Sequence, residues 1–126
     1  CDIFINNAYN SKYQSELLLK WFNKYKNTNK HIINIGSRDL FFFDKKPEPN
    51  EYSLNKKLLQ SYTRQLQYTH NRKCKITLLN PSYISYNEEK TEKSINKNDI
   101  LDLIEFIISK PNLEFQDILF RGFNYE

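Results

Sequence analysis

Residues 31–37 read His-Ile-Ile-Asn-Ile-Gly-Ser, a short apolar run that ends in a glycine and a hydroxyl. Two runs of the same kind lie at 2–6, Asp-Ile-Phe-Ile-Asn, and at 75–79, Lys-Ile-Thr-Leu-Leu. Because their bulky and β-branched residues are apolar on both sides of a strand, the three runs are typical of buried strands in a parallel sheet. Residues 115–120 predict a last strand.

Segments with helical periodicity separate these strands. The first, over 15–25, spaces its apolar residues three and four apart: Leu17, Leu18, Trp21, Phe22 and Tyr25. The second runs from about 51 to about 71, where one apolar stripe recurs every four positions: Leu54, Leu58, Tyr62 and Leu66. The third starts after Asn98, which we interpret as its N-cap, and ends before Pro111.

This alternation of strands and helices predicts an α/β fold. We expect a partial Rossmann-like parallel sheet with helices on both faces and right-handed crossovers. No internal repeat or domain boundary interrupts the pattern, so residues 1–126 are expected to form a single domain. Segments 38–50 and 81–97 fall outside the pattern, and both follow the carboxyl end of a strand, where open α/β sheets bind ligands.

Composition excludes several classes of partner. The 19 Lys and Arg residues exceed the 15 Asp and Glu residues by only 4, and the lysines are spread along the chain, so we predict no nucleic-acid partner. No apolar run reaches the ~18 residues that a membrane helix needs, so no membrane partner is expected. Cys1 and Cys74 lie too far apart to form a metal-ligand pair. We therefore predict no metal site and a reducing, cytoplasmic location.

Ser37, Tyr52 and Lys56 form a candidate catalytic set. Ser37 leaves a hydroxyl at the carboxyl edge of the predicted sheet, and the next helix begins with Tyr52 and Lys56. Side chains four residues apart share a helix face, with Cβ atoms ~5 to 6 Å apart. The pKa of a phenol, ~10, is too high for acid–base work at neutral pH, but an ammonium at that distance favours the phenolate by roughly 3 to 4 kcal/mol.

These residues resemble the short-chain dehydrogenase/reductase family, whose catalytic core is a Ser at a strand end and a Tyr-x-x-x-Lys on the following helix. Residues 6–8, Asn-Asn-Ala, resemble the Asn-Asn-Ala-Gly motif that closes the family's fourth strand, with Tyr9 in place of the glycine. Residues 80–82, Asn-Pro-Ser, stand where the family has Pro-Gly, with Ser82 in place of the glycine. The resemblance implies the second half of a doubly wound fold.

The resemblance also implies an NAD(P)-dependent oxidoreductase that transfers hydride between the nicotinamide and a small carbonyl or secondary alcohol. In the family the Tyr exchanges a proton with the substrate, the Lys lowers the pKa of the Tyr and holds the nicotinamide ribose, and the Ser fixes the carbonyl. These roles fall on Tyr52, Lys56 and Ser37, and counting back from Ser37 makes Asn10 the candidate for the family's proton-relay Asn. Besides Tyr52 and Lys56, the residues expected to contact NAD or NADP are Asn6, Asn7, Ala8, Pro81, Ser82 and Ile84.

The family's first half has no counterpart in this sequence. A turn that cradles a pyrophosphate needs several glycines close together, and the chain has only Gly36 and Gly122. We therefore expect a piece of a longer protein without its dinucleotide-binding half, with an exposed apolar sheet edge at 2–6. The resemblance further implies a homodimer or homotetramer through the helix at 51–71, and we expect segment 81–97 to close over the substrate.

A non-catalytic reading stays open. Tyr-x-x-x-Lys alone is a weak pattern, Ser37 could cap a strand end, and Asn6 and Asn7 could form a turn. The alternative is an α/β remnant or binding module that has lost its nucleotide site. A glycine-rich turn after an apolar strand in the upstream coding sequence would favour the enzyme.

Overall fold

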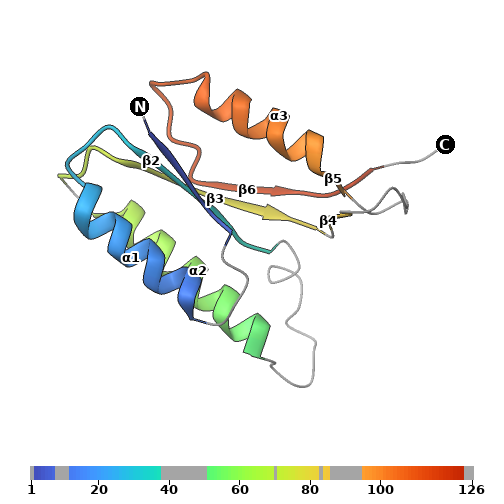
Figure 1. The fold of residues 1–126 in the computed structure, drawn as a ribbon, viewed down its shortest axis with the longest axis horizontal. Helices are drawn as coiled ribbons and strands as arrows, with labels where there is room; N and C mark the ends of the chain where they lie inside the picture. Colours follow the sequence, from blue (N-terminus) through green and yellow to red (C-terminus); the bar gives the residue numbers. More distant parts are fainter. Residues whose placement is uncertain are drawn as a thin grey trace.

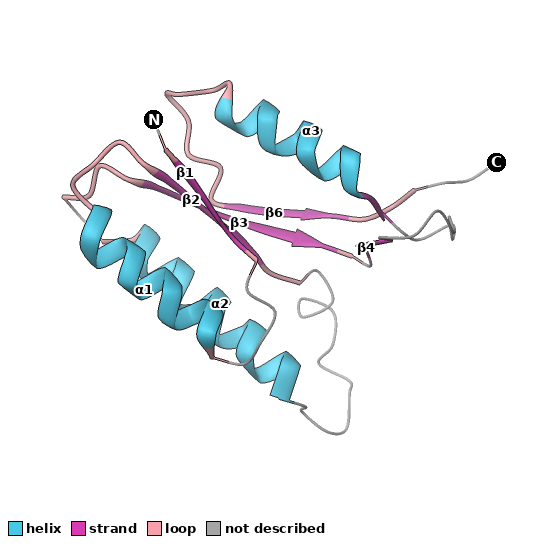
Figure 2. Cartoon of the chain, in the orientation of Figure 1, coloured by secondary structure: helices cyan, strands magenta, loops and turns pink. Residues whose placement is uncertain are grey.

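The computed structural model of the chain describes residues 2–7, 12–37, 51–69, 71–82, 84–85 and 95–123. The elements in chain order are β1 (Ile3–Asn6), α1 (Tyr13–Tyr25), β2 (His31–Ile35), α2 (Glu51–Gln67), β3 (Lys75–Pro81), β4 (Ile84–Ser85), β5 (Ile95–Asn96), α3 (Lys97–Ile108) and β6 (Asp117–Phe120). Four strands form a parallel sheet in the order β1-β2-β3-β6. Helices α1 and α2 cover one face of this sheet and α3 covers the other (Figure 1; Figure 2). The predicted α/β fold with helices on both faces is confirmed.

Strand β2 is buried along its whole length, because alternate side chains enter two different cores. Ile32 belongs to a core shared with α1, α2 and β3, whose other buried members are Leu18, Phe22, Leu59, Cys74, Ile76 and Leu78. Ile33 and Ile35 belong to a second core under α3, whose other buried members are Leu79, Ile104 and Ile107. The strand therefore holds the two helical layers together.

The crossovers do not all have the same hand. Strands β1, β2, β3 and β6 follow one another in one direction across the sheet, yet α1 and α2 lie on one face and α3 on the other (Figure 1). Crossovers that advance in one direction over opposite faces have opposite hands, so the expectation of right-handed crossovers throughout is wrong. The general preference for right-handed units makes β3–α3–β6 the exception. Residues 82–96 separate β3 from α3.

Helix α2 differs from its prediction in length and in buried face. It ends at Gln67 and not near 71, and Asn71 adopts the left-handed conformation, with φ 66°, in the turn that follows. Leu54, expected in the apolar stripe, is 53% exposed, while Thr63 and Gln67 are buried. Both polar side chains are satisfied, since Thr63 Oγ1 donates to Leu59 O at 2.7 Å and Gln67 Nε2 donates to Ile76 O at 2.9 Å.

The other helix and strand boundaries differ from the predicted ones by one or two residues. Asn96, and not Asn98, is the N-cap of α3, because its side chain accepts a hydrogen bond from Asn98 N at 2.9 Å. β3 continues two residues beyond the expected end, and β6 begins at Asp117 instead of 115. The short parallel pair β4–β5 was not predicted, because two residues per strand carry no periodicity. Within the described residues β1 has one neighbour, β2, and Ile5 is 46% exposed at the expected edge.

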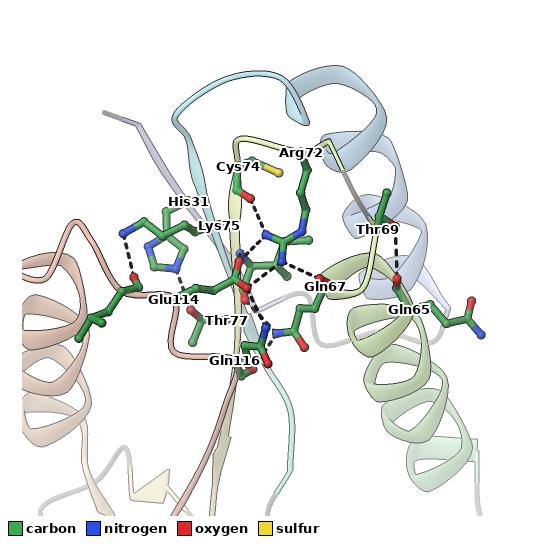
Figure 3. Close-up of polar contacts among 12 residues, drawn as sticks. His31, Gln65, Gln67, Thr69, Arg72, Cys74, Lys75, Thr77, Glu114 and Gln116 are labelled. Carbon is green, nitrogen blue, oxygen red and sulfur yellow. Dashed lines mark hydrogen bonds and ion pairs between the residues drawn. The ribbon is translucent and has the colours of Figure 1, made fainter.

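An ion pair between Arg72 and Glu114 closes the amino edge of the sheet (Figure 3). Arg72 Nη2 donates to Glu114 Oε1 at 2.7 Å and Arg72 Nη1 donates to Glu114 Oε2, and the two side chains are 13% and 17% exposed. The guanidinium also donates to the carbonyl oxygens of Gln67 and Cys74, and Ile76 N donates to Glu114 Oε2. This Arg72–Glu114 clamp thus ties the end of α2 and the start of β3 to the segment that leads into β6.

His31 is buried beside the clamp at the start of β2, with Nε2 2.8 Å from Thr77 Oγ1 (Figure 3). Burial is the main cause that lowers the pKa of His31 to about 4; the charge of Lys75 acts in the same direction and that of Glu114 in the opposite one. The imidazole is therefore neutral at pH 7, and its protonation opposes folding.

We expect Glu114→Gln to lower the free energy of unfolding by about 3 kcal/mol or more, because it leaves a largely buried guanidinium without its counter-ion. Burial by itself raises the pKa of Glu114, but hydrogen bonds from Arg72, Gln116 and Ile76 N, with the charge of Arg72, outweigh it and lower the pKa. Urea denaturation at pH 7 measures the loss. The control is Arg64→Gln, which breaks a half-exposed pair with Asp117 at 3.1 Å and should cost under about 1 kcal/mol. Equal losses in the two variants would contradict the role of the clamp.

We also expect the free energy of unfolding to fall as the pH decreases from 6.5 to 4. The unfolded chain binds a proton at His31 near pH 6.5, whereas the folded chain does so only near pH 4. The contribution is at most about 3 kcal/mol. Urea melts at pH 5 and 6.5 measure it, and the difference between these two pH values should shrink in His31→Gln. An unchanged difference would show that His31 does not titrate as the structure indicates.

Candidate functional site

The carboxyl ends of three neighbouring strands lie at one edge of the sheet, where Asn6, Ile35 and Pro81 are the last residues of β1, β2 and β3. Helix α2 starts at this edge and runs back along the sheet (Figure 1). Its first two turns carry Tyr52 and Lys56, so both side chains start close to the strand ends.

Lys56 reaches across to the end of β2. Its Nζ donates to Ile35 O and to Gln14 Oε1, both at 2.9 Å, and lies 5.8 Å from the centre of the Tyr52 ring. Tyr52 itself is 48% exposed. The four-residue spacing thus places an ammonium beside a phenol ring that solvent can reach.

Burial lowers the pKa of Lys56 to about 8. Removing an ammonium from water disfavours its charged form, and here no charged neighbour in the described part of the chain adds to the shift. Near neutral pH the side chain is therefore mostly an ammonium that can release its proton at small cost. This is the range in which general acid–base chemistry operates.

A buried polar network links Lys56 to the first two strands. Gln14 Nε2, on α1, donates to Asn6 O at 2.6 Å and to Ile35 O at 2.9 Å. Asn6 Nδ2 donates to Gln14 O at 2.8 Å and to Asn34 Oδ1 at 3.0 Å, and Asn34 Nδ2 donates to Thr63 Oγ1 at 3.2 Å. The network fixes α1 and α2 against the carboxyl ends of β1 and β2.

Ser37 is buried, with 8% of its surface exposed, and follows Gly36 directly after β2. Gly36 N donates to Leu79 O at 2.6 Å, which continues the pairing with β3. A Cβ at Gly36 would overlap Asn80 Oδ1 and lie 3.1 Å from Leu78 Cδ1, so any larger residue here would force these two buried side chains to move. Gly36 thus lets the end of β2 pack closely against β3, one residue before Ser37.

The other predicted site residues lie farther along the edge or outside the described residues. Asn7 follows β1 and is exposed, and Pro81 is buried at the end of β3. Ser82 joins β3 to the end of β6, since Ser82 N donates to Phe120 O at 3.0 Å. Ile84 pairs with Ile95 through the backbone of β4 and β5. Ala8, Asn10 and most of segment 81–97 lie outside the described residues.

Sequence reasoning missed Gln14. Gln14, Leu18 and Phe22 are spaced four apart and are all buried, so Gln14 is the first member of the buried stripe of α1. A glutamine in a buried stripe must satisfy its amide, and that requirement was the available signal.

Within the described ranges, no group of three or more His, Cys, Asp or Glu residues is arranged to hold a metal ion. In the same ranges, no helix combines the length and the apolar character that crossing a membrane requires.

No family model matches the chain, and no curated protein matches its sequence. Solved structures do match its fold. An alcohol dehydrogenase from the archaeon Thermococcus sibiricus, complexed with 5-hydroxy-NADP, has 11% identity and a TM-score of 0.72, over 99% of this chain and 64% of that one. A 4-hydroxyisoleucine dehydrogenase complexed with NADH and succinate has 19% identity and a TM-score of 0.66, over 97% of this chain and 67% of that one.

A short-chain dehydrogenase/reductase from Vibrio parahaemolyticus has 16% identity and a TM-score of 0.57, over 86% of this chain and 53% of that one. The chain thus spans about half to two thirds of the length of these enzymes. At such low identity the likeness concerns the fold. The chain has the fold of part of a short-chain dehydrogenase/reductase, as its sequence resemblance implied.

Proposed function

We propose that this chain is the catalytic part of an NAD(P)-dependent oxidoreductase that interconverts a small carbonyl compound and a secondary alcohol. The observation that carries the proposal is the position of Lys56, whose ammonium binds the end of β2 beside the ring of Tyr52. The fold supports it, because two of the similar structures were solved with nicotinamide cofactors.

The residues present fit the reactive end of a nicotinamide cofactor. The Lys56 ammonium has three N–H groups, and in the described part of the chain two of them have acceptors, Gln14 Oε1 and Ile35 O. One N–H is thus left to donate to a ribose hydroxyl. The pyrophosphate needs a glycine-rich turn, which this sequence does not contain, so those contacts belong to another part of the complete protein.

In this proposal the bound nicotinamide supplies or accepts the hydride. The phenol of Tyr52 exchanges the proton of the substrate oxygen, and the Lys56 ammonium favours the phenolate form of Tyr52 by its charge. Ser37, next to the strand end that holds Lys56, binds and orients the substrate oxygen. We also propose a dimer or tetramer through α2, as the sequence resemblance implies, and a cytoplasmic location, as the cysteine usage indicates.

In the complete protein, Tyr52→Phe should lower kcat by ~10²-fold or more, because it removes the proton-exchanging oxygen and keeps the ring. Tyr52 is 48% exposed, so stability should change little. Steady-state kinetics on a carbonyl substrate that the wild-type protein reduces measures the loss, and urea denaturation checks the fold. The matched control is Tyr62→Phe, on the same helix and packed against the core, which should leave kcat nearly intact. Wild-type turnover in Tyr52→Phe would exclude Tyr52 as the proton donor and favour a non-catalytic role for the chain.

Lys56→Met should also lower kcat, and it should move the alkaline limb of the pH profile upward, because no ammonium then favours the phenolate of Tyr52. The pH dependence of kcat, measured from pH 6 to 10, tests this expectation. Lys57→Met, at the neighbouring exposed position, is the control and should leave the profile unchanged. A Lys56→Met profile with the wild-type alkaline limb would separate Lys56 from the titration of Tyr52.

A further inference from the structure

The amide of Gln14 has only one orientation that its surroundings accept. Its Nε2 lies 2.6 Å from Asn6 O and 2.9 Å from Ile35 O, and carbonyl oxygens are acceptors only. A flipped amide would bring its own oxygen against these two oxygens. Gln14 Oε1 must therefore point the other way, which is toward Lys56 Nζ at 2.9 Å.

The backbone of Gln14 is fixed as well. Asn6 Nδ2 donates to Gln14 O at 2.8 Å, so Asn6 holds Gln14 through its own side chain and through its carbonyl. Gln14 is 4% exposed and Asn6 is fully buried. The oxygen offered to Lys56 is thus part of a rigid frame built on β1, β2 and α1.

Ile35 O completes the frame. It accepts from Gln14 Nε2 and from Lys56 Nζ, so both of its lone pairs are used. Gln14 Oε1 and Ile35 O hold Lys56 Nζ at two fixed points, whereas a lysine side chain in solvent samples many rotamers.

We infer that Gln14 is a positioning residue that holds the Lys56 ammonium at the carboxyl edge of the sheet and stabilises its charged form. The inference deepens the proposed function, in which the charge and position of Lys56 act on Tyr52. Gln14 does not touch the reacting atoms, and its effect passes through Lys56.

The groups that face Lys56 allow the effect of Gln14 on the pKa of Lys56 to be measured separately from the effects of charged neighbours. Helix α1 offers the uncharged Gln14 and β2 offers the carbonyl of Ile35, while Tyr52 faces Lys56 from its own helix α2. Among the described residues no charged group contributes to the lowered pKa of Lys56, which results from burial. Loss of the Gln14 oxygen therefore removes one of the two acceptors that offset this burial.

The experiment follows the Cε resonance of Lys56 by NMR in the protein with ¹³C-labelled lysine. Gln14→Met fills the same space without an acceptor, so we expect the Lys56 midpoint to fall by about one pH unit. The matched control is Gln67→Met, on α2. Gln67 Nε2 also bridges two carbonyl oxygens, those of Ile76 at 2.9 Å and Gln116 at 2.8 Å, and it has no contact with Lys56. Its loss should reduce stability and leave the Lys56 midpoint unchanged. A midpoint that stays or rises in Gln14→Met, or that falls equally in Gln67→Met, overturns the inference.

A measurement on the unaltered protein covers the case in which Gln14→Met does not fold. The side-chain amide resonances of Gln14 should shift with the Lys56 titration, because the amide oxygen feels the loss of the proton, and those of Gln67 should not. A Gln14 resonance that stays constant through the Lys56 midpoint overturns the inference. Both titrations need no substrate, so they can succeed even if Tyr52→Phe keeps full turnover and the proposed function fails.

Discussion

Burial of β2 on both faces is the constraint on which the rest of the structure depends. Ile32 requires the layer formed by α1 and α2, and Ile33 and Ile35 require α3. Complete burial of one isoleucine stabilises the fold by about 1.5 to 3 kcal/mol. Removal of either helical layer would therefore expose apolar side chains and cost several kcal/mol of stability. The same constraint fixes where β2 leaves the sheet. The carbonyl of Ile35, which accepts from Gln14 and Lys56, and the buried Ser37 therefore come to one edge, together with the first turns of α2.

The sequence determines the order and type of the main elements, because apolar runs of four or five residues and helical periodicity are local signals. Features that depend on tertiary contacts were predicted less well. The buried face of α2 includes the polar residues Thr63 and Gln67, and a search for periodic apolar residues does not find such a face. Asn96 rather than Asn98 became the N-cap of α3, since the two-residue strand β5 ends there. The opposite hand of β3–α3–β6 depends on the face of the sheet against which α3 packs, and no local sequence signal indicates that face.

In the candidate site, too, features with a local sequence signal were predicted and those that depend on tertiary contacts were not. The spacing of Tyr52 and Lys56 on one helix was sufficient to predict that they are neighbours, and the structure places the Lys56 ammonium 5.8 Å from the Tyr52 ring centre. The partner that orients Lys56 could not be found in this way, because Gln14 lies 42 residues away and meets Lys56 only through the packing of α1 against α2. Asn10, predicted for the relay by counting back from Ser37, lies outside the described residues and stays a prediction.

The Arg72–Glu114 clamp has a consequence for the kinetics of folding. Its two side chains are 42 residues apart in the sequence, and they meet at the edge opposite to the candidate site. Such a pair forms only after the chain between them has closed, and that chain includes β3, α3 and the long connection before α3. Contacts that form after the rate-limiting step slow unfolding and leave the folding rate almost unchanged. The clamp therefore slows unfolding to the extent that it forms after this step, and the contact between Gln14 and Lys56, also 42 residues apart, acts in the same way at the opposite edge.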